Sequence, residues 1–130
     1  MNTSNVALTV ATPGSAGHEL PAPADVLIPA HTSVVVDTGV TLSIQPGTYA
    51  QICSKSGHAF NGDIVAFPGL IDSDYTGSIA IKLTNMSDRE YRIPAGKSMA
   101  QILFGRYSLL DNAVVISTVT RTGGFGSTNQ

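Results

Sequence analysis

The segment best suited to chemistry is Pro68–Gly77, which reads Pro-Gly-Leu-Ile-Asp-Ser-Asp-Tyr-Thr-Gly. Strand-like runs flank it, so the sequence predicts a β-hairpin with two carboxylates, Asp72 and Asp74, and the phenol of Tyr75 at its turn. A carboxylate within hydrogen-bond reach of a water molecule can orient and activate that water for attack. Asp-Ser-Asp is also ordinary turn chemistry, so both interpretations remain open for the segment alone.

Three further segments carry groups that suit an anionic or aromatic ligand. Residues 54–57 read Ser-Lys-Ser-Gly and offer an ammonium group, hydroxyls and glycine N–H groups, which together suit a phosphate. Residues 95–102 lead from a turn into a strand with the polar Gln101 among apolar neighbours. The glycine-rich end, 121–130, holds Arg121 and Phe125, and is either a frayed terminus or a mobile arm that orders on a ligand.

Other kinds of site lack support in the sequence. His18, His31 and His58 are scattered without zinc-site spacing and are expected to be structural or exposed, and Cys53 has no second cysteine. There is no phosphate loop of the Gly-x-x-x-x-Gly-Lys-[Ser/Thr] type, no dinucleotide fingerprint and no local pattern for a Ser-His-Asp triad.

Composition narrows the class of protein. The chain has 130 residues, 42% of them hydrophobic and only 12% charged, with a formal net charge of −2, which argues against a nucleic-acid binder with a broad basic face. One cysteine excludes a disulfide-stapled secreted fold. No signal-peptide pattern and no apolar run of about 20 residues is present. We therefore expect a cytoplasmic or nuclear protein, neither secreted nor membrane-bound.

The elements that must position these groups are short strands between frequent turn signals. The pattern predicts an all-β single domain over residues 1–120 and a flexible C-terminal arm over 121–130. In the run from Ser78 to Thr84, side chains alternate, with Ile79, Ile81 and Leu83 on one face and Ala80, Lys82 and Thr84 on the other. At most one short helical turn is expected, and 106–116 is the only stretch long enough to suggest a helix. Strands are predicted at 33–36, 40–44, 78–84, 99–104 and 113–119.

Taken in order, these segments closely resemble the trimeric dUTPase (dUTP diphosphatase) family, from about Asn5 to Thr128. The segments around Asp72 and Phe125 are the most specific, because both read as unmodified family signatures. The five motifs lie at Gly14–Leu20, Ser54–Gly57, Gly69–Gly77, Gly96–Gln101 and Arg121–Thr128.

The resemblance implies a distorted jelly-roll (β-clip) fold that assembles as a homotrimer, with sites shared between subunits. The implied reaction is hydrolysis of dUTP to dUMP and diphosphate, which limits uracil incorporation into DNA and supplies dUMP for thymidylate synthesis. Mg²⁺ is the implied cofactor, held mainly by triphosphate oxygens, with Glu19 reaching it through water.

The resemblance also implies roles for individual residues. Asp72 would activate the attacking water and is the expected catalytic residue. Tyr75 would pack on the deoxyribose and exclude a 2′-hydroxyl, and main-chain groups of the hairpin would read uracil. The remaining implied contacts with the nucleotide are Lys55, Ser56, Gly57, Gly69, Ile71, Ile79, Gln101, Arg121 on the γ-phosphate, Phe125 stacked on uracil, and Gly126.

Three positions depart from the family pattern and suggest a viral or otherwise divergent member. Glu19 stands where aspartate is usual, Lys55 where arginine is usual, and Lys97-Ser98 where an acidic residue and arginine are usual. Two alternatives follow: a dUTPase-fold protein with weakened catalysis that binds partners, and a dCTP deaminase. The second is disfavoured because Lys82 stands where that family has its catalytic glutamate.

Overall fold

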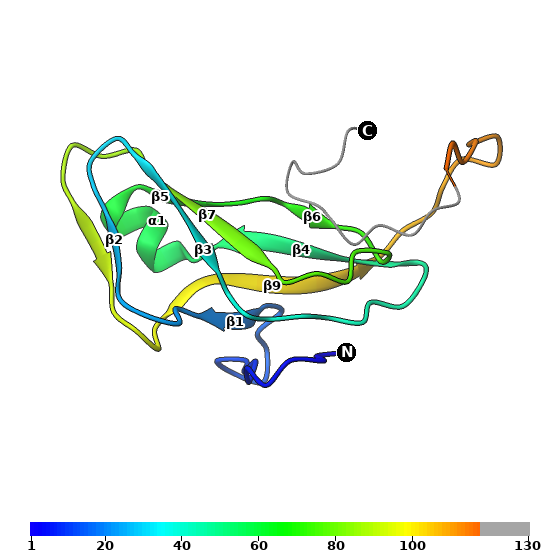
Figure 1. Cartoon of the computed structure of the whole chain (residues 1–130), viewed down its shortest axis with the longest axis horizontal. Helices are drawn as coiled ribbons and strands as arrows, with labels where there is room; N and C mark the ends of the chain where they lie inside the picture. The colour runs from blue at the N-terminus through cyan, green and yellow to red at the C-terminus, as the bar shows by residue number, and fades with distance from the viewer. Residues whose placement is uncertain (118–130) are drawn as a thin grey trace.

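The computed structural model describes residues 1–117, which form nine short strands and one short helix (Figure 1). The predicted all-β class is confirmed. The predicted arm at 121–130, with the predicted nucleotide contacts of Arg121, Phe125 and Gly126, lies outside the described residues. The elements are β1 (His18–Pro21), β2 (Val26–Ile28), β3 (Ser33–Asp37), β4 (Thr48–Ser54), α1 (Ser56–Gly62), β5 (Ile64–Phe67), β6 (Leu70–Ile71), β7 (Ala80–Asn85), β8 (Tyr91–Ile93) and β9 (Ser98–Arg106).

The strands form three antiparallel sheets, in the orders β1-β9-β4-β6, β3-β7-β5 and β2-β8. Each hydrogen-bonded pair joins strands that are not consecutive in the chain, so the sheets are built by crossovers, as in a jelly roll. The long strands β4 and β9 run along the length of the molecule (Figure 1). The helix α1 and strand β2 lie at one end, and the segment after β9 extends from the other.

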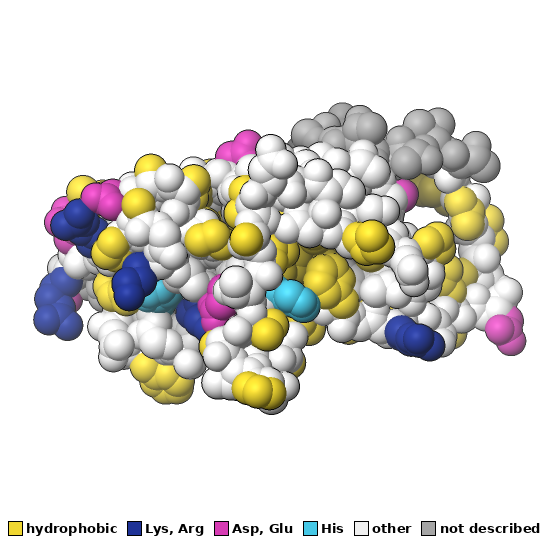
Figure 2. Space-filling view, turned by 90° about the horizontal axis from the view of Figure 1, so that it is seen from below, with side chains coloured by type: hydrophobic (Ala, Val, Ile, Leu, Met, Phe, Trp, Pro, Cys, Tyr) yellow, Lys and Arg dark blue, Asp and Glu magenta, His cyan; other side chains and the backbone are white. Residues whose placement is uncertain are grey.

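The interior between the sheets is almost wholly aliphatic. Ile79, Ile81 and Leu83 are buried as the alternation predicted, whereas Lys82 between them is exposed. Charged side chains are sparse on the face shown in Figure 2, and most of them lie at the end that holds β2. The buried core comprises Leu20, Ala22, Val26, Ile28, Val40, Leu42, Ile44, Ala50, Ile52, Ile64, Ala66, Ile71, Ile79, Ile81, Leu83, Ile93, Met99, Ala100 and Ile102.

Two predicted strands are wrong. Residues 40–44 bury alternate side chains, yet their only β-pairing among the described residues is an isolated bridge between Leu42 and Asn2. The backbone there bonds instead to the N-terminal segment and to Ile79, which satisfies it without a ladder. Residues 113–117 form no strand, and the rest of the predicted 113–119 run lies beyond the described part.

The position suggested for a helix is also wrong, because 106–116 is not helical and α1 lies at Ser56–Gly62 instead. That seven-residue segment contains two glycines and is too short to show a helical period. Strand β7 begins at Ala80 rather than Ser78, whose hydroxyl bonds to Asp37. Within residues 1–117, no helix is both long and apolar enough to cross a membrane.

Asn85 is a fully buried polar side chain at the end of β7. Its Nδ2 donates to the carbonyls of Ile28 (2.9 Å) and Arg89 (2.7 Å). Its Oδ1 accepts from the backbone N–H and the hydroxyl of Ser87, at 2.9 and 2.7 Å. One side chain thus ties the end of β2 to the turn that follows β7.

We expect Asn85→Leu to destabilise the fold by about 3 kcal/mol, because it leaves several buried backbone groups without partners. Thermal unfolding followed by circular dichroism measures the effect, with the exposed Asn112→Ala as the control. A variant that melts at the wild-type temperature would show that these bonds add nothing to stability.

Candidate functional site

The sheet β1-β9-β4 brings three of the predicted motifs together. In its register, Glu19 of β1 lies opposite Gln101 of β9, and Gln101 lies opposite Cys53 of β4. Lys55 follows directly after β4, at the end of the same row. The first, second and fourth motifs therefore meet at one end of the sheet because antiparallel pairing places them there.

Side-chain contacts join the residues of these three motifs. Lys55 Nζ lies 2.8 Å from Glu19 Oε1, and Gln101 Nε2 donates to the carbonyl of Ser54 at 3.1 Å. A Cβ on Gly17 would stand 2.4 Å from Gln101 Oε1, so only glycine leaves room for the glutamine in this position. We name Glu19, Lys55, Ser56, Gly57 and Gln101 the phosphate cluster, after the ligand that the sequence predicts.

The Glu19–Lys55 pair is largely shielded from solvent, with 19% and 27% of the two side chains exposed. Burial alone would raise the pKa of Glu19, but the hydrogen bond from Lys55, the nearby Ser98 hydroxyl and the charge of Lys55 together hold that pKa below its usual value. Glu19 is therefore ionised at neutral pH. Its second oxygen, Oε2, is buried and has no hydrogen-bond partner within residues 1–117.

An unpartnered carboxylate oxygen next to a predicted triphosphate site suits a hydrated, hard cation. No cluster of three or more His, Cys, Asp or Glu side chains that would enclose a metal occurs in the described chain. The donor set therefore fits a cation that the protein touches through one carboxylate, and does not fit a cation held in a protein cage.

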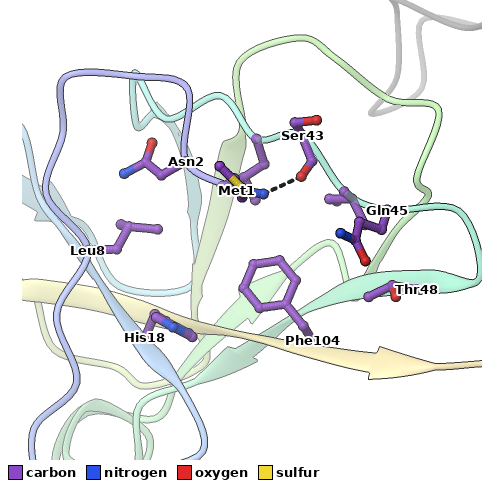
Figure 3. A pocket seen from close by; sticks show the side chains of 10 residues that line it. Met1, Asn2, Leu8, His18, Ser43, Gln45, Thr48 and Phe104 are labelled. Atoms are coloured by element: carbon purple, nitrogen blue, oxygen red, sulfur yellow. Dashed lines mark hydrogen bonds between the residues drawn. The ribbon is translucent and has the colours of Figure 1, made fainter.

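His18, next to Glu19 on β1, points the other way because side chains alternate along a strand. Its ring faces a hollow of about 360 Å³ under the N-terminal segment, where Phe104 meets it edge-on with the ring centroids 5.5 Å apart (Figure 3). The amino group of Met1 closes the far side by donating to the Ser43 carbonyl. No predicted site residue lines this hollow.

The hairpin motif forms a second cluster. Strands β5 and β7 pair as the two arms of the predicted hairpin, but the connection between them also contributes β6, which pairs with β4. Ile71 lies opposite Ala50, so Asp72 follows at the level of Tyr49. There Asp72 lines an open hollow of about 590 Å³ together with Tyr49, Leu70, Ser73, Asp74, Tyr107, Ser108 and Leu109.

Tyr75 is half-buried and packs against the core. Its hydroxyl donates to the Ser78 carbonyl at 2.5 Å, which fixes the ring within the hairpin. Burial, with a smaller contribution from the charge of Asp37, raises the pKa of the phenol, so it stays neutral. We name Gly69, Ile71, Asp72 and Tyr75 the hairpin cluster.

Ile79 belongs to the core rather than to either cluster. Its N–H donates to the Val40 carbonyl at 2.9 Å, and its own carbonyl accepts from the backbone and the hydroxyl of Thr38. A base near Ile79 would have no free N–H there to bind. The predicted contact of Ile79 with the nucleotide stays a prediction.

Asp72 of the hairpin cluster and the phosphate cluster lie at opposite ends of β4. Asp72 is level with Tyr49, whereas Lys55 follows the last residue of that strand. Six residues of strand separate these positions by about 20 Å. Gly69 lies between them, because its carbonyl accepts from the N–H of Ile52. One chain therefore holds Asp72 and the phosphate cluster apart.

Sequence reasoning did not anticipate two contacts in the site. Glu19 and Lys55 were each singled out as departures from the family pattern, and that paired departure was the available signal for their ion pair. His58, for which the sequence predicts a structural or exposed role, is structural, because its ring bonds to both Tyr91 and Ser98. No sequence pattern indicated that bridge, because the three residues lie on separate elements.

Comparison with known proteins matches residues 4–129 to the dUTPase family model. The chain belongs to the dUTPase family. Among curated relatives, the deoxyuridine 5′-triphosphate nucleotidohydrolase of Paramecium bursaria Chlorella virus 1 is 37% identical over 118 residues, covering 88% of this chain and 84% of that protein. The Saccharomyces cerevisiae protein of the same name is 36% identical over 129 residues, covering 92% and 86%.

Solved dUTPases share the fold. The Streptococcus mutans dUTPase superposes with a TM-score of 0.72 at 25% identity, covering 82% of this chain and 90% of that one. The dUTPase of Staphylococcus bacteriophage 80alpha gives a TM-score of 0.75 at 20% identity, covering 86% and 90%. The dUTPase of the S. aureus phage phi11 is described with a structural Mg(II) ion.

We expect Glu19→Gln to lower the stability of the ligand-free protein by about 1 kcal/mol at neutral pH, because Lys55 loses its counter-charge. Since folding lowers the pKa of Glu19, its stabilisation is present above the ordinary value of 4.5 and is lost as the pH falls through the lowered value.

Urea unfolding of wild type and variant at pH 7 and well below pH 4.5 measures this, with the exposed Glu90→Gln as the control. The gap between wild type and Glu19→Gln should close in acid. A gap of the same size at both pH values would contradict the ion-pair assignment.

Proposed function

We propose that this chain hydrolyses dUTP to dUMP and diphosphate, and thereby limits uracil incorporation into DNA and supplies dUMP for thymidylate synthesis. The observation that carries the proposal is the match of residues 4–129 to the dUTPase family, with Asp72 and Tyr75 in the hairpin that the family signature occupies.

The working site is proposed to be shared between chains of a homotrimer. A separation of about 20 Å between Asp72 and Lys55 along β4 is too long for one water-activating carboxylate and one phosphate-binding turn to act on the same bond. The hairpin cluster of one chain therefore meets the phosphate cluster of a neighbour. Assembly is further supported by the exposed apolar side chains after β9, namely Leu109, Leu110, Val114, Val115 and Ile116.

At the hairpin, Asp72 orients a water molecule in line with the bond to be broken and accepts its proton. Tyr75 is held by the Ser78 carbonyl so that its ring packs against deoxyribose and leaves no room for a 2′-hydroxyl. Main-chain groups around Gly69 and Ile71 read the uracil edge. A neutral phenol is suited to this steric role, because it adds no charge beside the sugar.

At the phosphate cluster, Ser56 and Gly57 bind the α- and β-phosphates. Gln101 of β9 contacts the phosphates as well. Lys55 adds a positive charge and also forms an ion pair with Glu19. Arg121 on the γ-phosphate, Phe125 stacked on uracil, and Gly126 would close the site from the C-terminal arm, as the family motif implies. Closure of this kind excludes bulk water from the reacting phosphate.

The cofactor is proposed to be Mg²⁺, with Glu19 Oε2 as the protein oxygen that reaches its hydration shell. When bound, the ion neutralises charge on the triphosphate oxygens. Lys55 keeps the Glu19 carboxylate ionised and oriented, so the chain presents a formed acceptor before any ligand arrives.

The two alternatives are less well supported. The unusual Glu19 and Lys55 would favour a protein with weakened catalysis. These two residues form a close pair at 2.8 Å, however, so glutamate, which is longer than the usual aspartate, compensates for lysine, which is shorter than the usual arginine. A dCTP deaminase needs an acid-base carboxylate where this chain has Lys82, which is exposed on the outer face of β7.

We expect Asp72→Asn to reduce dUTP turnover by about 10²–10⁴-fold while retaining nucleotide binding, because the isosteric amide cannot accept the proton of the water. Diphosphate release from dUTP, dCTP, dTTP and UTP, with and without Mg²⁺, measures turnover and specificity together. The exposed Asp88→Asn serves as the control.

Only dUTP should be turned over rapidly by the wild-type protein. Near wild-type turnover by Asp72→Asn would show that the catalytic role is misassigned. Failure of the wild-type protein to hydrolyse dUTP would overturn the proposed function itself.

A further inference from the structure

The helix α1 is almost without apolar anchoring. Its only buried residue is Gly62, and Phe60 is 88% exposed. A seven-residue helix is far too short to be stable alone, so contacts with the rest of the protein must hold it. The helix begins at Ser56. Its N-terminus has no capping hydrogen bond from the side chain of Lys55 and no acidic residue in the first turn.

His58 supplies the missing anchor. Its Nε2 lies 2.7 Å from the Ser98 carbonyl on β9, and its Nδ1 lies 2.7 Å from the Tyr91 hydroxyl on β8. Because a carbonyl only accepts, Nε2 carries a proton and donates to it, and Nδ1 forms the second hydrogen bond with the Tyr91 hydroxyl. One imidazole thus binds the first turn of α1 to two strands at once.

Tyr91 packs against both ends of helix α1. Its ring meets that of His58 edge-on, with centroids 5.5 Å apart and an interplanar angle of 79°. At the other end of α1, a Cβ on Gly62 would stand only 2.2 Å from Tyr91 Cδ1, so glycine is needed for the ring to fit. Burial raises the pKa of the phenol, so Tyr91 keeps its proton beside His58.

We propose that His58, held by Tyr91 and Ser98, is a positioning residue that fixes Ser56 and Gly57 for binding the phosphates. It stands two positions after Ser56 on the same helical turn, so tilting α1 away from β9 would move both predicted phosphate contacts. It does not touch the hairpin cluster. This inference rests on the proposed function and adds to it the residue that orients the phosphate-binding turn.

Two probes separate this role from general stability. The non-hydrolysable imido analogue of dUTP engages both clusters, whereas deoxyuridine, which has no phosphate, engages only the hairpin cluster. Calorimetric titration of each probe is compared among the wild type, His58→Leu, Tyr91→Phe and His58→Gln. The exposed His31→Asn is the matched control, and dUTP hydrolysis by the wild type reports separately on the proposed function.

His58→Leu should weaken binding of the imido analogue by about tenfold or more, since two hydrogen bonds are lost, and should leave deoxyuridine affinity within about twofold. Tyr91→Phe should weaken it by about threefold, because one bond is lost and the ring remains. His58→Gln, whose amide N–H can reach the Ser98 carbonyl, should recover much of the affinity.

Unchanged affinity of His58→Leu for the imido analogue would overturn the proposal, as would an equal loss for both probes. If His58→Leu does not fold, Tyr91→Phe decides by the same selective criterion. A wild-type protein that hydrolyses dUTP while His58→Leu or, where that variant does not fold, Tyr91→Phe binds the analogue normally would leave the proposed function intact and refute the role of His58.

Discussion

The pairing of β4 with its neighbours is the constraint on which the rest of the site depends. The strand register decides where the site residues lie: β1 and β9 place Glu19 and Gln101 beside the end of β4, while β6 places Asp72 beside its beginning. The rise of a strand is fixed, so Asp72 and Lys55 stay about 20 Å apart in any one chain. The proposed reaction needs both residues, and for this reason we propose that a second copy of the chain completes the site.

Within the phosphate cluster, electrostatics and geometry reinforce each other. Burial disfavours the charge on Glu19, but Lys55 at 2.8 Å and the nearby Ser98 hydroxyl together more than offset it, and the second carboxylate oxygen has no partner within residues 1–117. A chain with only 12% charged residues thus keeps an ionised pair where a polyanionic ligand would need it. In the same region Gly17, which has no side chain, leaves room for Gln101.

Much of this was predictable from the sequence, and the exceptions have physical causes. The alternation in β7 identified Ile79, Ile81 and Leu83 as core because a buried strand face has a strict period of two. Residues 40–44 alternate equally well, but their backbone bonds go to the N-terminal segment, a tertiary choice that periodicity does not report. Helix α1 was missed because Ser-Gly-His-Ala-Phe-Asn-Gly has poor intrinsic helix propensity and is held by His58 and Tyr91 instead. The motifs predict which residues form the site. Their positions along β4 could be known only from the register of the sheet, which pairs residues far apart in the sequence.

The central claim, that each site combines the hairpin of one chain with the phosphate cluster of another, is tested most directly by mixing two inactive variants. Asp72→Asn supplies an intact phosphate cluster, and the double variant Lys55→Ala/Ser56→Ala supplies an intact hairpin. Refolded together in equal amounts, random trimers should regain about a quarter of the wild-type dUTP hydrolysis, because about one site in four combines two intact halves. Activity no greater than that of the separate variants would show that each chain carries a complete site, and would contradict the shared-site account.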